Sequence, residues 1–322
     1  AGPVTHAGIY DGEEYDARIP MGFETPEKLG TPVVNTDFPG EIIPTCGAEV
    51  YLREDLRLRP VKMYVWQGVT GNVWNGDWTK SEYGKVVVLR DYSDGDTVEL
   101  APGETLVVDF GQNCAGVPSF VFKAKGGTVL TCLPGEILND GNGAERRGMD
   151  GPEGSVHRRN LRTFDHHFRL VYTFARGDDF VDYTPRYTFF GYRYASITAT
   201  DEVVISSIRS IPVTSIAQNM ETGTITTGNK DINQLISNTL WGQRSNYLSV
   251  PTDCPQRDER LGWMADTQVF AETGTFFANT DRFFHKWMRD VRDSQSPTGA
   301  FTGVSPIAQY GGSPHDMMRL GG

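Results

Sequence analysis

The sequence is poor in cysteine, in basic charge and in long apolar runs, and each shortage argues against a class of protein. Its 322 residues include four cysteines, Cys46, Cys114, Cys132 and Cys254, with no Cys-x-x-Cys pair and no histidine at ligand spacing. We therefore expect free thiols and no structural zinc site. The net charge of −11 argues against a nucleic-acid partner. No run approaches about 18 apolar residues, so we predict no membrane span.

Signals for export or for a bound cofactor are also missing. The opening residues, AGPVTHAGIYDG, lack the basic and apolar regions of a signal peptide. An exported and a cytoplasmic location both stay open. The acidic composition could suit calcium, but no segment has the ligand spacing of a calcium loop, so we predict no cofactor and no metal.

The first two thirds of the chain have the pattern of β-structure. Short runs rich in Val, Thr, Phe and Tyr alternate with turn residues, which predicts an antiparallel β-sandwich over residues 86–215. The runs are Gly84–Tyr92, Thr105–Gly111, Pro118–Leu133, His166–Asp179 and Tyr192–Thr200. The Lys-Gly-Gly step after Phe122 predicts a hairpin turn. Residues 1–85 read as a β-rich remnant of an N-terminal domain with a linker, in which Trp74 and Trp78 more plausibly pack than stack on sugar.

Residues 216–322 change to a helical pattern. Apolar residues recur at helical spacing in three segments, 231–243, 266–280 and 281–294, and Asn229 is placed to cap the first. Several stripes are aromatic, and so few helices bury them poorly. We therefore expect this chain to be one piece of an all-helical domain that is completed elsewhere, and the missing remainder of that domain is its expected partner.

The segment Val250–Trp263, VPTDCPQRDERLGW, concentrates charge between the first two helices. The simplest interpretation is a single helical turn capped by Asp253. A second interpretation is chemical. On such a turn Arg257 faces Asp253, four residues away, and keeps it ionised. Trp263 reduces the hydration of Glu259, which favours the protonated form of that carboxyl. Asp266, at the start of the next helix, can reach the same space. Two carboxyl groups in unlike settings suit cleavage of a glycosidic bond.

The segment DCPQRDERLGW, followed by Met-Ala-Asp, resembles the signature of the bacterial-type α-L-rhamnosidases, glycoside hydrolase family 78. Three further stretches resemble the same family in the same order. They are IYDGEEYDAR (Ile9–Arg18), VVDFGQNCAGVPSF (Val107–Phe120) and YTPRYTFFGYRYASI (Tyr183–Ile197). Four ordered matches of this length are far more specific than one short pattern.

The resemblance implies β-sandwich domains ahead of an (α/α)6 barrel, of which residues 216–322 would be the beginning. It implies an inverting hydrolase that removes terminal α-L-rhamnose from glycosides or polysaccharides. By position, Glu259 resembles the general acid, and Asp253, Arg257, Trp263 and Asp266 resemble sugar-pocket residues. Met264 departs from the threonine common in the family, which bears on the sugar rather than on the reaction.

The resemblance places the general base, a Glu, in later barrel helices, and no residue of this chain matches it. The chain is thus expected to hold the acid without the base and to be inactive alone. Two other functions stay open: a non-catalytic carbohydrate-binding β-sandwich, and a docking fragment of a larger assembly. Glu136, beside the polar loop Asn139–Ser155, could also belong to a distant site.

Overall fold

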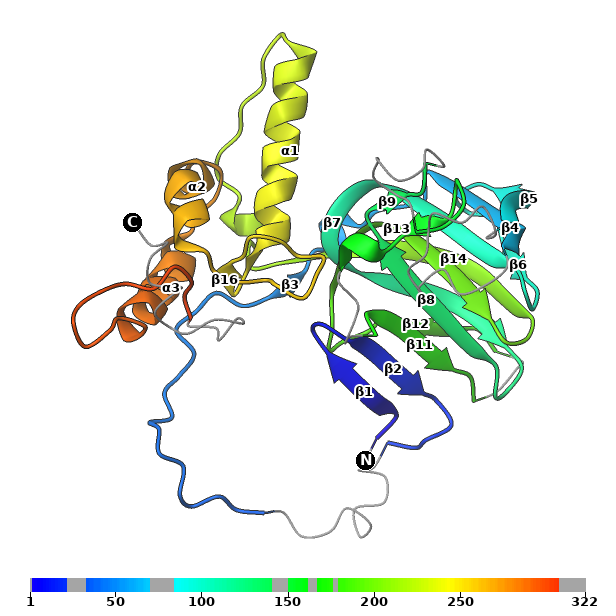
Figure 1. Ribbon diagram of the computed structural model, residues 1–322, viewed down its shortest axis with the longest axis horizontal. Helices are drawn as coiled ribbons and strands as arrows, with labels where there is room; N and C mark the ends of the chain where they lie inside the picture. The colour runs from blue at the N-terminus through cyan, green and yellow to red at the C-terminus, as the bar shows by residue number, and fades with distance from the viewer. Residues whose placement is uncertain are drawn as a thin grey trace.

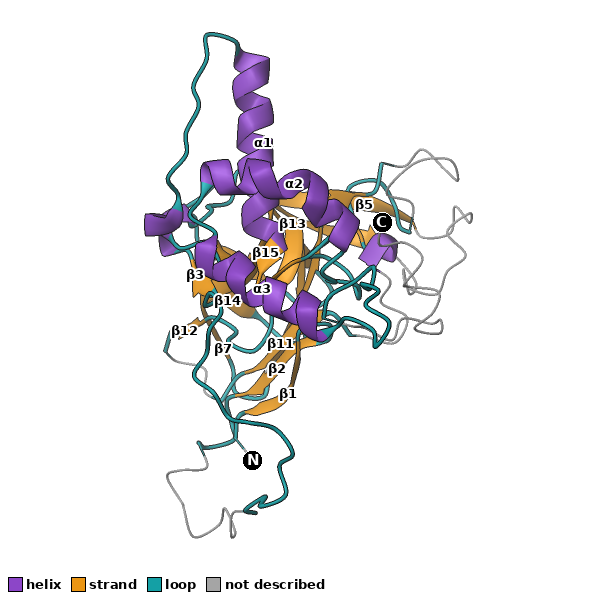
Figure 2. Ribbon diagram, turned by 90° about the vertical axis from the view of Figure 1, so that its left-hand side faces the viewer, coloured by secondary structure: helices purple, strands orange, loops and turns teal. Residues whose placement is uncertain are grey.

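The computed structural model describes residues 2–21, 33–69, 84–140, 150–161, 167–175 and 179–306 (Figure 1). A broad β-structure fills one side of the molecule, and three helices lie on the other (Figures 1 and 2). Trp74, Trp78, His166 and most of the polar loop predicted at Asn139–Ser155 fall outside the described residues. None of the described helices is long and apolar enough to cross a membrane.

Within the described residues, fourteen strands build the β-structure and its margins, and twelve of them lie in one hydrogen-bonded sheet. They are β1 (Val4–Gly8), β2 (Gly12–Asp16), β3 (Tyr51–Leu52), β4 (Lys62–Val69), β5 (Gly84–Tyr92), β6 (Val98–Leu100), β7 (Thr105–Ala124), β8 (Val129–Gly135), β9 (Ile137–Leu138), β10 (Val156–His157), β11 (Arg169–Thr173), β12 (Val181–Tyr183), β13 (Phe190–Ala199) and β14 (Val203–Thr214). The main path runs β1-β2-β11-β8-β13-β7-β14-β3. Every pair is antiparallel except β2 with β11.

The core of this β-structure confirms the predicted sandwich. Side chains on β7, β8, β11 and β14 alternate between buried and part-exposed positions, as strands with one inward face must. Aromatic rings dominate the interior: Phe122 packs edge-on against Tyr172 and Phe174, with centroids 4.8 Å away in both cases. These contacts join β7 to the opposite strands, so burial of aromatic surface holds the layers together.

The hairpin predicted between Phe122 and Val129 is wrong. The turn exists, with Gly127 at a φ of +89°, but the strands that it joins do not pair with each other. The C-terminal half of β7 pairs with β12 and β14, whereas β8 pairs with β11 and β13. A tight glycine turn sets the direction of the chain, but the partner of each strand is chosen by core packing.

Strands from both sides of the boundary predicted at residue 85 lie in one sheet. From the N-terminal segment, β1 and β2 extend the sheet through β11, β3 pairs with β14, and β4 pairs with both β5 and β7. The described strands of residues 1–85 thus add to the sandwich. The boundaries at 85 and 215 stay predictions.

The three predicted helices are present. They are α1 (Lys230–Asn246), α2 (Met264–Phe277) and α3 (Asp281–Asp293), with the short strands β15 (Tyr247–Leu248) and β16 (Val250–Pro251) after α1. Asn229 caps α1 as predicted, because its side chain accepts hydrogen bonds from the backbone N–H groups of Asp231 and Ile232. Phe283 of α3 stacks on Tyr247, with ring centroids 4.5 Å apart, and ties α3 to the end of α1.

Much of the apolar surface of these helices is exposed, as the sequence led us to expect. Leu235 of α1, Phe276 of α2 and Met288 of α3 are all more than half exposed, and Val269 of α2 is 83% exposed. The described helices therefore bury only part of their apolar faces.

Candidate active site

The charged segment is a loop with no helical turn, so the capped-turn interpretation is wrong. Residues 252–262 leave β16 and return to the start of α2 without regular structure. The ends of the loop are tied together instead. Asp253 N–H donates to the carbonyl of Leu261 over 3.2 Å, and Leu261 N–H donates to Asp253 Oδ1 over 3.1 Å. Asp253 thus closes the loop with its backbone and its side chain at once.

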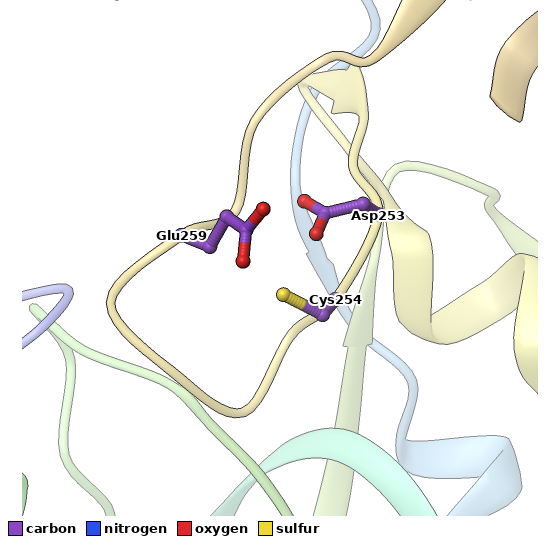
Figure 3. Close-up of side chains that lie close together, drawn as sticks. All are labelled: Asp253, Cys254 and Glu259. Carbon is purple, nitrogen blue, oxygen red and sulfur yellow. The ribbon is translucent and has the colours of Figure 1, made fainter. Parts of the chain in front are cut away.

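The closed loop brings two carboxylates and a thiol together. Ligand atoms of Asp253, Cys254 and Glu259 lie within 4.8 Å of one another. Figure 3 shows the carboxylates of Asp253 and Glu259 facing each other across the loop, with the sulfur of Cys254 near both. Arg257 lies in the same space. Its Nε and Nη2 are 3.0 Å and 2.8 Å from Glu259 Oε2, and its Nη2 is 4.0 Å from Asp253 Oδ2.

The pairing of charges differs from the prediction. We expected Arg257 to hold Asp253 in its ionised form, but Arg257 bonds directly to Glu259. Burial raises the pKa of Asp253, and the neighbouring charge of Glu259 raises it further, against hydrogen bonds from Cys254 and from the N–H of Leu261. Without a helical turn, the four-residue spacing no longer brings the guanidinium onto Asp253.

Cys254 behaves as a packed thiol, as predicted. Its side chain is buried, and burial raises its pKa to about 12. A thiol this hard to ionise is a poor nucleophile. The three ligand atoms lie close enough together for a metal ion, but Glu259 is already paired with the guanidinium of Arg257, whose positive charge repels a cation. The four cysteines are free, as expected.

The charged loop is anchored to residues of the β-structure that are distant in the sequence. Arg260 is buried with a φ of +52° and donates from Nη1 to the carbonyl of Ile9 over 2.6 Å and from Nη2 to that of Phe189 over 3.2 Å. Its guanidinium also lies 4.1 Å from the ring centroid of Phe189. Tyr10 donates its hydroxyl proton to the carbonyl of Glu259 over 2.9 Å. The backbone of Glu259 is therefore fixed by residues of the sandwich.

A glycine lets the loop lie directly on strand β13. A Cβ at Gly191 would stand 2.7 Å from the backbone of Gln256, closer than real side chains approach. Because Gly191 has no side chain, the backbone of the loop can pack directly against β13. The resembling stretches around Ile9 and Gly191 thus converge on the charged loop.

The remaining predicted site residues lie beside this cluster. Trp263 is half-buried at the position before α2, and its carbonyl accepts from Thr267 N–H and Thr267 Oγ1. Asp266 is exposed in the first turn of α2, as predicted. Met264 begins the helix, and its N–H donates to Gly303. The contact expected between the Trp263 indole and Glu259 stays a prediction, as do the roles of all five site residues.

Sequence reasoning gave no role to Tyr10, Gly191 or Arg260. The first two lie in stretches that carry the family resemblance, and Arg260 is part of the signature itself. Their place in these stretches was the signal in the sequence that could have pointed to them. Their function as anchors depends on contacts across the fold that neither spacing nor composition reveals.

Comparison with known proteins gives one consistent result. The model of the bacterial alpha-L-rhamnosidase concanavalin-like domain matches residues 93–214, and that of the bacterial alpha-L-rhamnosidase six-hairpin glycosidase domain matches residues 220–318. An alpha-L-rhamnosidase of Streptomyces avermitilis is 31% identical over 95% of this chain and 25% of its own length. A second, from Formosa agariphila, is 28% identical over 97% of this chain and 29% of its own.

Solved structures agree. The Streptomyces avermitilis alpha-L-rhamnosidase complexed with L-rhamnose superposes with a TM-score of 0.71 and 29% identity, covering 97% of this chain and 26% of that one. The alpha-L-rhamnosidase from Dictyoglumus thermophilum gives 0.65 and 25%, covering 95% and 29%. The chain spans between a quarter and a third of the relatives that it matches. With a concanavalin-like domain followed by part of a six-hairpin glycosidase domain, the chain belongs to the bacterial α-L-rhamnosidase family.

Proposed function

We propose that this chain supplies the general acid of an inverting α-L-rhamnosidase, an enzyme that removes terminal α-L-rhamnose from glycosides or polysaccharides. Glu259 protonates the departing glycosidic oxygen, and water attacks the anomeric carbon from the other side. Family membership supports the substrate class, and a related enzyme has been solved with L-rhamnose. No cofactor takes part in this chemistry.

The observation that carries the proposal is the fixed position of Glu259. Arg257 holds one carboxylate oxygen, Tyr10 holds the backbone carbonyl, and the neighbouring Arg260 is locked into the sandwich. A proton donor must meet the leaving oxygen within hydrogen-bond reach, and a donor held at several points loses little entropy in doing so. Asp253, Arg257, Trp263 and Asp266 would then contact the sugar around it.

Asp253 is not a suitable general base for this acid. An inverting pair stands roughly 6.5–9.5 Å apart to admit the attacking water. The nearest ligand atoms of Asp253 and Glu259 lie within 4.8 Å, and Arg257 reaches toward both carboxylates. Glu272, exposed on α2, is not part of this cluster. We infer that the base is a carboxylate outside this chain, in the remainder of the six-hairpin domain.

The acid role is tested by replacing Glu259 with Gln in the complete natural polypeptide. General-acid catalysis contributes about 10²–10⁴-fold, but only where the leaving group needs a proton. The variant should lose that factor on an alkyl rhamnoside and far less on a nitrophenyl rhamnoside, whose leaving group departs unprotonated. Glu272→Gln is the matched control and should leave both rates unchanged. Equal losses of the Glu259 variant on both substrates would contradict the acid role.

The 322-residue chain alone should show little or no hydrolysis, because it lacks the base. Rhamnoside turnover by the purified chain is the measurement, and clear turnover would refute the assignment of the base to another segment. The second candidate function, a sandwich that binds sugar without catalysis, predicts that Glu259→Gln causes no loss of sugar binding.

A further inference from the structure

A polar cavity lies between the sandwich and α1, and no residue of the charged loop lines it. It has a volume of about 660 Å³. Its lining is Gly111, Gln112, Asn113, Glu136, Ile137, His157, Asn160, Arg193, Gln234 and Asn238. Three of these belong to the stretch Val107–Phe120, which the sequence singled out and which the charged loop does not use. The lining shares no residue with the cluster of Asp253, Cys254 and Glu259.

A large bulge in β7 creates the sandwich wall of this cavity. Along the pairing of β7 with β13, Tyr194 stands opposite Asp109 and Tyr192 stands opposite Cys114, so residues 110–113 face Arg193 alone. Phe110 turns into the core, edge-on to Tyr192. The next three residues bulge out of the pairing with β13 and line the cavity. Bulges of this kind commonly re-aim side chains at functional sites.

Hydrogen bonds hold the polar groups of the lining in place. Glu136 accepts from Asn113 Nδ2 over 2.9 Å at one oxygen and from Asn160 Nδ2 over 2.8 Å at the other. The remaining amide oxygen of Asn160 is buried and has no hydrogen-bond partner among the described residues. The two hydrogen bonds to Glu136 thus fix the orientation of both amides in the lining.

Each basic side chain of the lining lies against a carboxylate. Arg193 makes two hydrogen bonds of 2.8 Å to the carboxylate of Asp109. His157 Nδ1 lies 3.1 Å from Asp150 Oδ1. The lining therefore presents paired basic groups, the carboxylate of Glu136 and several side-chain amides, each both a donor and an acceptor. This chemistry matches hydroxyl groups better than a phosphate or a carboxylate.

The opposite wall is one face of α1. Gln234 and Asn238 are four residues apart, and the side chain of Gln234 donates to that of Asn238 over 2.8 Å. Both are exposed. Asn238 lies about 12 Å along the helix axis from the end of α1, where the chain turns toward the charged loop. The two sites are thus separate but rest on the same helix.

We propose that this cavity binds a neutral sugar residue, as a second carbohydrate site distinct from the one at the charged loop. Its volume is in the range typical of small-ligand sites. The amides and Glu136 offer donors and acceptors to hydroxyls, and the carboxylate of Glu136 disfavours anionic sugars. The proposal does not depend on catalysis at Glu259.

The test measures equilibrium binding of single sugars to the purified chain. Binding is monitored by ligand-observed NMR at sugar concentrations up to the millimolar range. The probes are L-rhamnose, D-glucose and D-galactose, with glucose 6-phosphate as the anionic comparison. At least one neutral sugar should bind saturably. Asn238→Ala should weaken that binding several-fold, and Gln112→Ala combined with Asn238→Ala at least tenfold. Asn238 is an exposed helix residue, so its variant reports on the cavity even if a change in β7 impairs folding.

Two variants locate the site. Leu235→Ala, on the same helix but outside the lining, should leave the affinity unchanged, and Glu259→Gln separates sugar bound at the charged loop from sugar bound in the cavity. Binding that is lost with Glu259→Gln but not with Asn238→Ala would overturn the proposal. So would the absence of saturable binding by every neutral sugar, or tighter binding of glucose 6-phosphate. Because the readout is affinity, a failure of the proposed catalytic role leaves this result standing.

Discussion

At the scale of single residues, the site depends on which carboxylate the arginine takes. Arg257 bonds to Glu259, and Asp253 is left with backbone and thiol partners in a partly buried position. The two carboxylates thus differ in setting, but the pairing is the reverse of the one that the sequence suggested: the raised pKa belongs to Asp253, and the arginine lies on Glu259. Local hydrogen bonds within the loop decided this, and spacing along the chain did not.

Asp253→Asn should make stability less sensitive to pH. An unfolded Asp titrates near about 3.9. Burial raises the pKa in the folded chain, so between these two values the folded state binds more protons and the free energy of unfolding falls as pH rises. Asn keeps the acceptor for Leu261 without the charge. The variant should therefore gain stability relative to the wild type from pH 4 to pH 7, measured as thermal midpoints. Asp293→Asn, on the surface, controls for the loss of a carboxylate. A difference in midpoint between Asp253→Asn and the wild type that stays the same from pH 4 to pH 7 would contradict the prediction.

At the scale of elements, the charged loop keeps its conformation because neighbouring elements leave room for it and bind it. Strand β13 offers a glycine under Gln256, and the turn between β1 and β2 offers Tyr10. The loop itself has no regular structure to hold it. Its geometry is therefore a property of the surface on which it lies.

Gly191→Ala should displace the loop. The new Cβ would meet the backbone of Gln256 at 2.7 Å, and such overpacking costs about 1–3 kcal/mol of stability. The complete polypeptide should also lose rhamnosidase activity. Gly242→Ala in α1 is the matched control: its Cβ meets nothing within 4 Å, and Ala in an exposed helix stabilises by about 0.5–1 kcal/mol. Denaturant unfolding should thus show a lower free energy of unfolding for Gly191→Ala and a higher one for Gly242→Ala. Changes of the same sign would argue against close packing of the loop on Gly191.

The elements themselves were largely readable from the sequence. Strand β5 begins and ends at the predicted residues Gly84 and Tyr92, and α3 begins at the predicted Asp281, because alternation and helical periodicity are local signals. Pairing is not local, which is why the Lys-Gly-Gly turn was taken for a hairpin. The charged loop was found from its composition and its resemblance, but its shape required contacts with Ile9 and Phe189 that no pattern shows.

At the scale of the whole molecule, the apolar faces of the helices remain exposed. Val269 and Phe276 are seven residues apart on one face of α2, and both are exposed. Patches of this kind mark surfaces that another element covers. In a longer polypeptide, the further helices of the six-hairpin domain are the expected cover.

Replacing Val269 and Phe276 with Gln should act in opposite directions in the two contexts. In the isolated chain the double variant should self-associate less and keep its thermal midpoint, because exposed apolar surface is removed. In the complete polypeptide it should lower the midpoint, because buried apolar contacts are lost. The free energy of unfolding should fall by about 2–5 kcal/mol if both side chains are fully covered. Glu272→Gln on the same helix is the control. Gel filtration and thermal unfolding are the measurements, and equal effects in both contexts would show that nothing covers this face.

The bond from Tyr10 to Glu259 joins residues 249 positions apart. At a synthesis rate of roughly 5–20 residues per second, the first hairpin leaves the ribosome some 10–50 s before its partner has been made. Closing so long a loop is entropically costly and slow. The backbone of Glu259 should therefore reach its final position late in folding, and removal of the β1–β2 hairpin should disturb it.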